Sequence, residues 1–223
     1  MNMTLDLDHV FILVDPGAAV ADLLVAEGFQ EGSRNRHPGQ GTANRRFYFA
    51  NGMVEFLWVH NADEALNGPG RDLYFPERAA DPKASPFGMI FLKKEDGDNI
   101  PFDSTTMPFA GWTYQAICFQ PPNDFHVGIN SQNIMDPLCL YSPIPFPKAP
   151  SRNPQGNTSF TISHICIHTP SDDKTGVLGA IAPVDRLSIQ TAQAQHLMEI
   201  TLNNHATGTT KDFRPAIPLI MHW

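Results

Sequence analysis

The chain has 223 residues, of which 42% are hydrophobic and 17% charged, so it is long and apolar enough to form a packed interior. Its formal net charge of -8 argues against a nucleic-acid partner, because phosphates require a basic surface. The longest apolar runs are too short to cross a bilayer, and the N-terminus lacks a basic segment followed by an apolar core. We therefore expect a cytoplasmic protein with no membrane partner.

Proline and glycine are abundant, with 20 and 16 residues, and they predict many turns between short strands. The three cysteines are odd in number, and each lies in an apolar run. We expect buried free thiols, since no pair has the close spacing of a zinc or redox motif. These residues are Cys118, Cys139 and Cys166.

The opening segment alternates between two faces, as a β-strand does, over residues 5–14. Strict alternation predicts that His9 points toward a core or a cavity together with its apolar neighbours. A histidine that is hydrogen-bonded within the core is the simpler alternative. The residues predicted to share this face are Leu5, Leu7, His9, Phe11 and Leu13.

The next segment carries signals for one helix and three strands. An aspartate followed by proline predicts the start of a helix, and a glycine predicts its end. The dipeptide Asn51-Gly52 predicts a tight hairpin between the last two strands. The expected elements are a helix from Asp15 to about Gly28 and strands at 29–33, 46–49 and 53–59.

Glu55 stands out because its neighbours along the strand are Val, Phe, Leu and Trp. A buried carboxylate is costly unless a cation, a proton or a metal compensates it. The residues leave two explanations open. Glu55 either belongs to a functional site or forms a buried ion pair with Arg45, Arg46 or His9.

The polar loop of residues 37–45 is the second functional signal. Its glycines permit backbone conformations that other residues avoid, and its polar side chains offer hydrogen-bond donors. Arg45 can bind a carboxylate or phosphate through two hydrogen bonds. The alternative is a loop that only braces the adjacent strand. The predicted substrate-binding residues are His37, Gln40, Asn44 and Arg45.

The strand–helix–strand–strand–strand order, His9, the loop and Glu55 together resemble the glyoxalase-like domain family of the vicinal-oxygen-chelate (glyoxalase/bleomycin-resistance/dioxygenase) superfamily. The resemblance covers residues 5–59. It implies an α+β fold in which paired βαβββ modules form an open, cupped mixed β-sheet barrel. It also implies a divalent metal, with ligands from the first and fourth strands of each module.

The same order of elements recurs near the C-terminus, which indicates an internal duplication. We therefore expect a first module at residues 1–60 and a second, similar module at 158–223. Residues 61–157 are expected to be a connector with additional strands and a proline-rich linker. In that connector, no acidic residue stands where a fourth-strand ligand is expected, and Tyr141 is the nearest side chain.

The duplication aligns His164 with His9 and places His222 where Glu55 stands in the first module. Two or three imidazoles and one carboxylate would suit Zn, Fe, Mn or Ni. Alternatives stay open, since Glu199, His168 and His196 compete for two of the positions and His222 could be a surface residue. The predicted metal ligands are His9, Glu55, His164 and His222.

Two functions follow from these residues and the resemblance. The first is a divalent-metal-dependent enzyme, a lyase, isomerase or dioxygenase, acting on a small oxygenated molecule, with Glu55 as the catalytic proton carrier. The second is a metal-free protein of the same fold that binds or sequesters a small molecule. A homodimer is left open.

Overall fold

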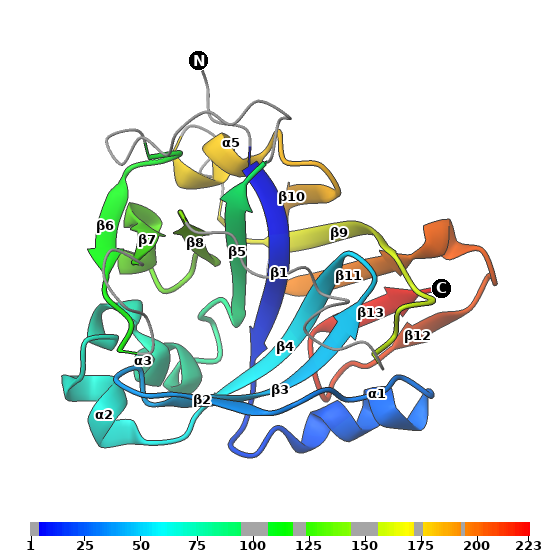
Figure 1. Ribbon diagram of the computed structural model, residues 1–223, viewed down its shortest axis with the longest axis horizontal. Helices are drawn as coiled ribbons and strands as arrows, with labels where there is room; N and C mark the ends of the chain where they lie inside the picture. Colours follow the sequence, from blue (N-terminus) through cyan, green and yellow to red (C-terminus); the bar gives the residue numbers. More distant parts are fainter. Residues whose placement is uncertain (1–4, 95–106, 118–123, 144–155, 172–175, 193–194) are drawn as a thin grey trace.

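The computed structural model describes residues 5–94, 107–117, 124–143, 156–171, 176–192 and 195–223. Most strands belong to a curved sheet of eight, in the spatial order β2-β3-β4-β1-β5-β8-β7-β6 (Figure 1). Its strands are β1 (Leu5–Leu13), β2 (Asn35–His37), β3 (Thr42–Phe49), β4 (Gly52–Val59), β5 (Phe87–Lys93), β6 (Gly111–Tyr114), β7 (Phe125–Gly128) and β8 (Leu138–Ser142).

The curved sheet consists of two halves that repeat one pattern. In each half an inner pair is parallel, β1 with β4 and β5 with β8, and the remaining pairs are antiparallel. The halves join through antiparallel pairing of β1 with β5. This arrangement confirms the predicted α+β fold with an open, cupped mixed sheet.

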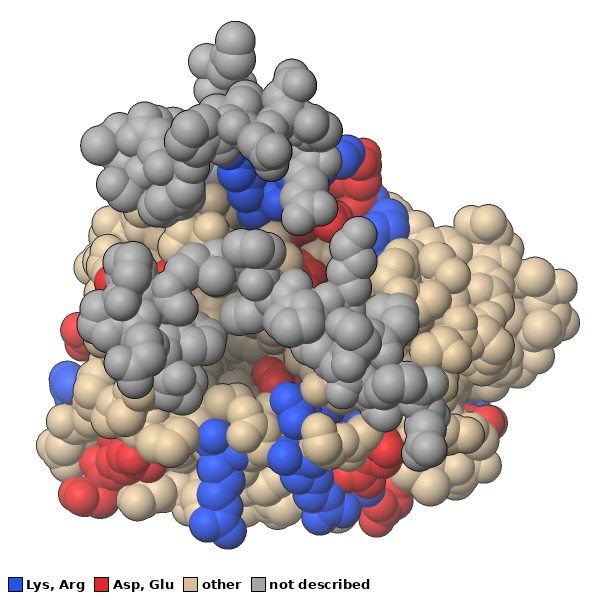
Figure 2. Space-filling view, in the orientation of Figure 1, with Lys and Arg blue, Asp and Glu red and all other residues tan. Residues whose placement is uncertain are grey.

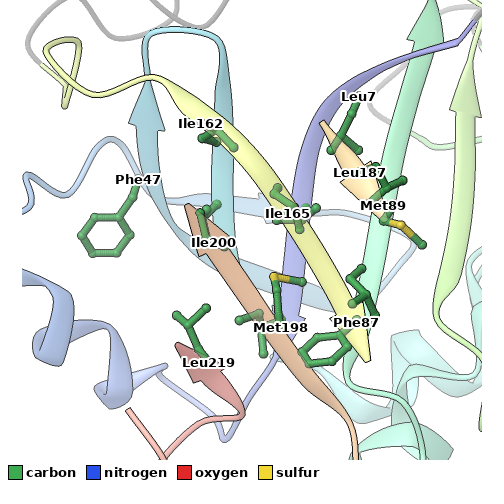
Figure 3. Close-up of a cluster of buried hydrophobic side chains, with 14 of the residues drawn as sticks. Leu7, Phe47, Phe87, Met89, Ile162, Ile165, Leu187, Met198, Ile200 and Leu219 are labelled. Carbon is green, nitrogen blue, oxygen red and sulfur yellow. The ribbon is translucent and has the colours of Figure 1, made fainter. Parts of the chain in front are cut away.

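A second sheet of five strands, in the order β10-β9-β11-β13-β12, lies against one side of the curved sheet (Figure 1). The two sheets share one apolar core, where Leu7, Phe87 and Met89 meet Ile165, Met198 and Ile200 (Figure 3). The strands are β9 (Ile162–Thr169), β10 (Leu187–Thr191), β11 (Leu197–Leu202), β12 (Thr210–Asp212) and β13 (Leu219–His222).

Eight short helical segments complete the described fold, and they cover sheet faces or connect strands. The segment around α1 packs into the core between the sheets through Ala21 and Leu24. The helical segments are η1 (Ala19–Ala21), α1 (Asp22–Ala26), α2 (Ala62–Asn67), η2 (Arg71–Leu73), α3 (Phe75–Ala80) and α5 (Val177–Ile181), together with the single turns η3 (Ile129–Gln132) and η4 (Asn203–His205). None of the described helices is long and apolar enough to cross a membrane.

The pairing of modules differs from the expected one. The half that completes the curved sheet comes from residues 87–142, within the expected connector. Residues 162–222 form the separate second sheet instead. The physical reason is that β5 occupies the open edge of β1, while the apolar face of β9 and β11 covers the outer side of the curved sheet.

The first strand also differs from strict alternation, because a bulge at Asp8 shifts its register against β5. Leu5 and Leu7 therefore enter the core between the sheets, on the side of Val10 and Ile12. His9 faces the opposite side, the side on which Phe11 and Leu13 also lie. Because of the bulge, Leu7 and His9 lie on opposite sides of the curved sheet, Leu7 in the core between the sheets and His9 in the cavity.

Other local expectations have mixed outcomes. The order strand, helix, strand, strand, strand and the hairpin at Asn51 are confirmed. The helix begins later than Asp15, because Gly17 and Ala18 adopt positive φ angles of 87° and 48°. Strand β2 lies at 35–37 rather than 29–33. Cys139 and Cys166 are buried free thiols as expected, and Cys118 lies outside the described residues.

Gly88 provides a test of how β1 and β5 fit together. A Cβ at residue 88 would overlap the ring of Phe11, its partner on β1. We expect Gly88→Ala to lower the free energy of unfolding by about 1–3 kcal/mol, as overpacking does. Chemical denaturation measures this loss. In a Phe11→Leu background the loss should shrink, and an equal loss in both backgrounds would contradict the proposed overlap.

Candidate functional site

The inner side of the curved sheet holds a cavity of about 230 Å³. In the space-filling view this face is hollowed near its centre, and acidic atoms are visible in the hollow (Figure 2). Glu55 is the only acidic residue among those that line the cavity in the described part of the chain. The lining residues are His9, Phe11, Asn35, His37, Pro38, Gln40, Arg46, Met53, Glu55, Leu57, Phe75, Ile90, Tyr114, Ala116, Phe125 and Leu140.

The two halves of the sheet contribute different chemistry to this cavity. All the charged, imidazole and amide side chains come from residues 9–55, in the first half. Residues 75–140 contribute aromatic and aliphatic side chains, among which Tyr114 and Phe125 are stacked with ring centroids 6.4 Å apart. The cavity therefore has a polar wall opposite an apolar wall.

Glu55 lies in the polar wall with only 6% of its surface exposed. Its neighbours Val54 and Phe56 face the core between the sheets, so alternation along β4 directs Glu55 into the cavity. It pairs with Phe11 on β1 and with Arg46 on β3. Among the described residues, the one hydrogen-bond donor to its carboxylate is the side-chain amide of Asn44.

Asn44 is fully buried and is held in one orientation. The backbone N–H of Asn35 can only donate, so the atom that faces it at 2.8 Å is Oδ1. The amide nitrogen Nδ2 therefore faces the other way. There it donates to Glu55 Oε1 and lies 3.4 Å from Nε2 of His37.

This orientation determines the tautomer of His37. Because Asn44 Nδ2 can only donate, Nε2 of His37 accepts, and the imidazole proton is on Nδ1. That N–H donates to Thr42 Oγ1 at 2.9 Å, and Gln40 donates to the same oxygen at 2.7 Å. Burial lowers the pKa of His37 below its usual value, although the Glu55 carboxylate acts in the opposite direction.

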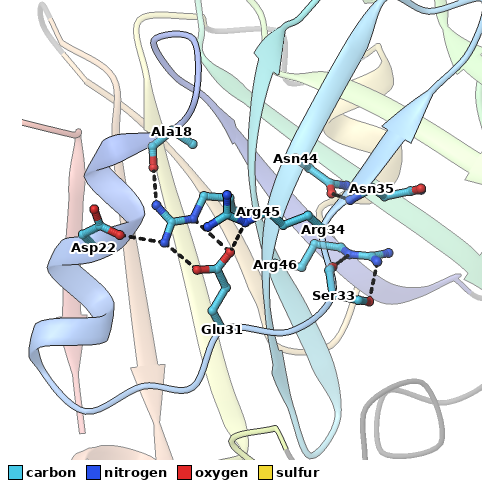
Figure 4. Close-up of polar contacts among 9 residues, drawn as sticks. All are labelled: Ala18, Asp22, Glu31, Ser33, Arg34, Asn35, Asn44, Arg45 and Arg46. Carbon is cyan, nitrogen blue, oxygen red and sulfur yellow. Dashed lines mark hydrogen bonds and ion pairs between the residues drawn. The ribbon is translucent and has the colours of Figure 1, made fainter.

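Arg46 and His9 flank Glu55, but each is engaged elsewhere. The Arg46 guanidinium donates to the carbonyl and hydroxyl oxygens of Ser33 at 2.6 and 2.7 Å (Figure 4) and lies over the ring of Tyr48. His9 Nδ1 lies 2.6 Å from Asp8 Oδ2. Neither side chain makes an ion pair with Glu55 in the described part of the chain.

Arg45, a predicted substrate-binding residue, lies on the opposite side of the sheet. It donates to Ala18 O at 3.0 Å, to Asp22 Oδ1 at 2.7 Å and to Glu31 (Figure 4), and the hydrogen bond to Glu31 raises its pKa. Alternation on β3 directs Asn44 and Arg46 toward the cavity and Arg45 away from it. His37 and Gln40 do line the cavity, and Asn44 lies directly behind it.

The four predicted metal ligands do not converge. His9 and Glu55 line the cavity, whereas His164 and His222 lie in the second sheet, where His164 bonds to Ser188 at 2.8 Å. The described residues include no group of three or more His, Cys, Asp or Glu side chains placed to hold a metal ion. The donor set as it stands therefore does not fit a metal centre. In the second half, Tyr141 is fully buried in the core between the sheets.

Two of the competing residues do meet His222, in the second sheet. Glu199 lies 2.7 Å from His168 Nε2 through one oxygen and 3.1 Å from His222 Nε2 through the other. Burial opposes the effect, but these two imidazoles hold the pKa of Glu199 below its usual value. His196 lies apart, with Nε2 3.2 Å from the carbonyl oxygen of Lys83.

Sequence reasoning did not place Arg46 or the apolar wall in the site. Arg46 could have been found by alternation from Asn44, had the strand been started at residue 42. Residues such as Tyr114 and Phe125 carry no local signal, because they reach the cavity only through the pairing of β5 to β8 with the first half.

A curved sheet of two similar halves with a cavity on its inner side defines the vicinal-oxygen-chelate fold class. Residues 7–99 match the family model described as a glyoxalase-like domain, in agreement with the resemblance seen in the sequence. No curated protein matches the chain.

Several solved chains match this protein, and one example is similar over almost its whole length. It is the crystal structure of a hypothetical protein from Staphylococcus aureus, with a TM-score of 0.63. The similarity covers 98% of this chain and 99% of that chain at 10% sequence identity. At this identity the comparison shows a shared fold, which includes the second sheet.

The lowered pKa of His37 predicts how stability depends on pH. An imidazole whose pKa is lowered by folding stabilises the protein above its unfolded pKa of about 6.5, and this contribution is lost as the pH falls below that value. We expect the free energy of unfolding to decrease from pH 7.5 to 5.5, and to decrease less in His37→Gln. Denaturant titrations at several pH values measure this. His60→Gln, at an exposed histidine, is the control, and identical pH profiles for wild type and His37→Gln would refute the prediction.

Proposed function

We propose that this protein binds a small organic molecule in the cavity of the curved sheet, with Glu55 as the main polar contact and without a resident metal. The observation that supports this most directly is the Glu55 carboxylate. It is buried in a cavity with an apolar opposite wall, and Asn44 is its one donor among the described residues. A carboxylate in such surroundings needs a further partner.

The dimensions and lining of the cavity limit the ligand. A volume of about 230 Å³ lies below the usual range of roughly 300–1,000 Å³ for drug-sized ligands, so a molecule of about one ring fits. The apolar wall favours an aromatic or aliphatic body, through contacts with Phe75, Tyr114 and Phe125. The polar wall favours one polar group at the end that meets Glu55.

Metal independence is supported by the contacts of the predicted ligands. Glu55 accepts from an amide, and His164 and His222 are bonded within the second sheet. His37, which meets the same amide nitrogen of Asn44 as Glu55 does, directs its Nε2 to that amide. The chemistry we propose therefore needs only groups of this chain.

A lyase or isomerase reaction is a second candidate. In this reaction Glu55 takes a proton from the bound molecule, as a general base. The observation that favours it is that Oε2 has no donor among the described residues, while Oε1 is held by Asn44. The proton would move from a C–H or O–H of the ligand to Oε2 and return to the product. Turnover by wild type that is lost in Glu55→Gln would support this candidate.

Ligand binding can be tested with two small isomers, benzyl alcohol and anisole, each of which has one ring. We expect at least one of them, at about ten times its Kd, to raise Tm by about 3–6 °C. Ala116→Trp should abolish the effect, because residue 116 lines the cavity and the indole would fill it. Thr113→Trp, at an exposed position of β6, is the matched control and should retain binding. Equal shifts in Ala116→Trp and wild type would contradict the proposed site.

Metal independence predicts that protein purified without chelator or histidine tag contains Zn, Fe, Mn and Ni well below one ion per chain. Dialysis against EDTA should leave Tm unchanged, since the described donors do not form a metal site. Elemental analysis and thermal unfolding measure both. Stoichiometric metal that disappears in Glu55→Ala would overturn the proposal and restore the metal-dependent enzyme.

A further inference from the structure

We propose that the ligand presents a hydrogen-bond donor, a hydroxyl or ammonium group, to Oε2 of Glu55, and that Asn44 is the positioning residue that fixes this preference. The inference rests on the proposed function, because it specifies the polar end of the molecule bound in the cavity. It excludes ligands whose polar end is only an acceptor, such as an ether, a ketone or a carboxylate.

The first step concerns the carboxylate. An ionised carboxylate only accepts hydrogen bonds, and each of its oxygens has room for more than one donor. Asn44 donates to Oε1, and the described residues provide no donor to Oε2. Glu55 lines the cavity and is only 6% exposed, so Oε2 meets whatever occupies the cavity. A ligand with a donor group meets this need, and a ligand with only acceptors places two oxygens against each other.

The second step concerns three other polar side chains of the wall, which donate to protein oxygens. Arg46 donates to Ser33, and the Gln40 amide donates to Thr42 Oγ1. His37 donates from Nδ1 to the same threonine oxygen. These bonds engage the named donors with the protein, which leaves the Glu55 carboxylate as the acceptor we propose for the ligand.

The third step concerns Asn44, which sets the orientation of the whole group. Its Oδ1 is fixed by the Asn35 N–H, so its two amide hydrogens must face Glu55 and His37. This arrangement holds the Glu55 side chain in one position and keeps the His37 proton on Nδ1. Asn44→Asp keeps the shape of the side chain and replaces its amide with a carboxyl group beside Glu55, so the two carboxyl groups share one proton.

The test compares benzyl alcohol with anisole, which have the same atoms but differ in that only the alcohol donates. We expect wild type to bind benzyl alcohol at least about tenfold more tightly than anisole, because only the alcohol can donate a hydrogen bond to the buried carboxylate. Calorimetry measures both affinities. Benzylamine should bind at least as tightly as the alcohol if the natural group is ammonium, and more weakly if it is hydroxyl. Anisole binding as tightly as both would overturn the inference while leaving the proposed function intact. Binding of none of the three would instead overturn the proposed function.

A test of Asn44 must measure a property that would stay the same if Asn44 only supported the fold. The tautomer of His37 is such a property. In wild type, ¹⁵N spectra of the histidine side chains should show His37 protonated on Nδ1. In Asn44→Asp we expect the proton on Nε2, facing the new carboxylate, and the preference for benzyl alcohol over anisole should fall to less than about threefold. Asn44→Ser, which keeps a small donor, covers the case in which the aspartate variant does not fold. An unchanged tautomer or an unchanged preference in the folded variant would refute the positioning role.

Discussion

The burial of one carboxylate constrains the arrangement around the cavity. Glu55 lies on a strand whose alternate residues belong to the core between the sheets, so it cannot turn outward without exposing Val54 and Phe56. The nearest guanidinium, on its cross-strand neighbour Arg46, is bonded to Ser33. The carboxylate is therefore supported by an amide rather than by a charge, which leaves part of its hydrogen-bonding capacity directed into the cavity.

The second sheet makes this cavity possible because it covers only one side of the curved sheet. Residues of β9 and β11 bury the outer side, together with the segment around α1. The inner side keeps a smaller apolar cluster, formed by residues such as Phe11, Tyr114 and Leu140, around the hollow. On this open side, polar side chains such as Glu55 and His37 line the cavity next to the apolar cluster.

Part of this site could be predicted from the sequence, and the rest depended on features without a local signal. Glu55 was found because a charge among apolar residues violates the pattern of its strand. The side on which Arg45 lies could not be deduced, because β3 begins at Thr42 within a segment that looks like a loop. Strict alternation placed His9 correctly on the side of Phe11, but it put Leu5 and Leu7 there too, because it does not contain the bulge at Asp8. The partner half at residues 87–142 depends on which strand reaches the open edge of β1, and short-range patterns do not determine that.

Each of the two sheets places a glutamate near histidines, but the hydrogen bonds of the two glutamates differ. In the second sheet, Glu199 has an imidazole on each oxygen, His168 on one and His222 on the other, so its hydrogen bonds are satisfied within the protein. In the curved sheet, Glu55 has one amide, and the nearby imidazole of His37 is turned to that amide. A duplicated pattern of histidine and carboxylate therefore does not by itself indicate a shared metal. Of these two cavity-side and fold-side carboxylates, Glu199 has both oxygens engaged by the protein and Glu55 has one, which is why the proposed ligand is assigned to Glu55.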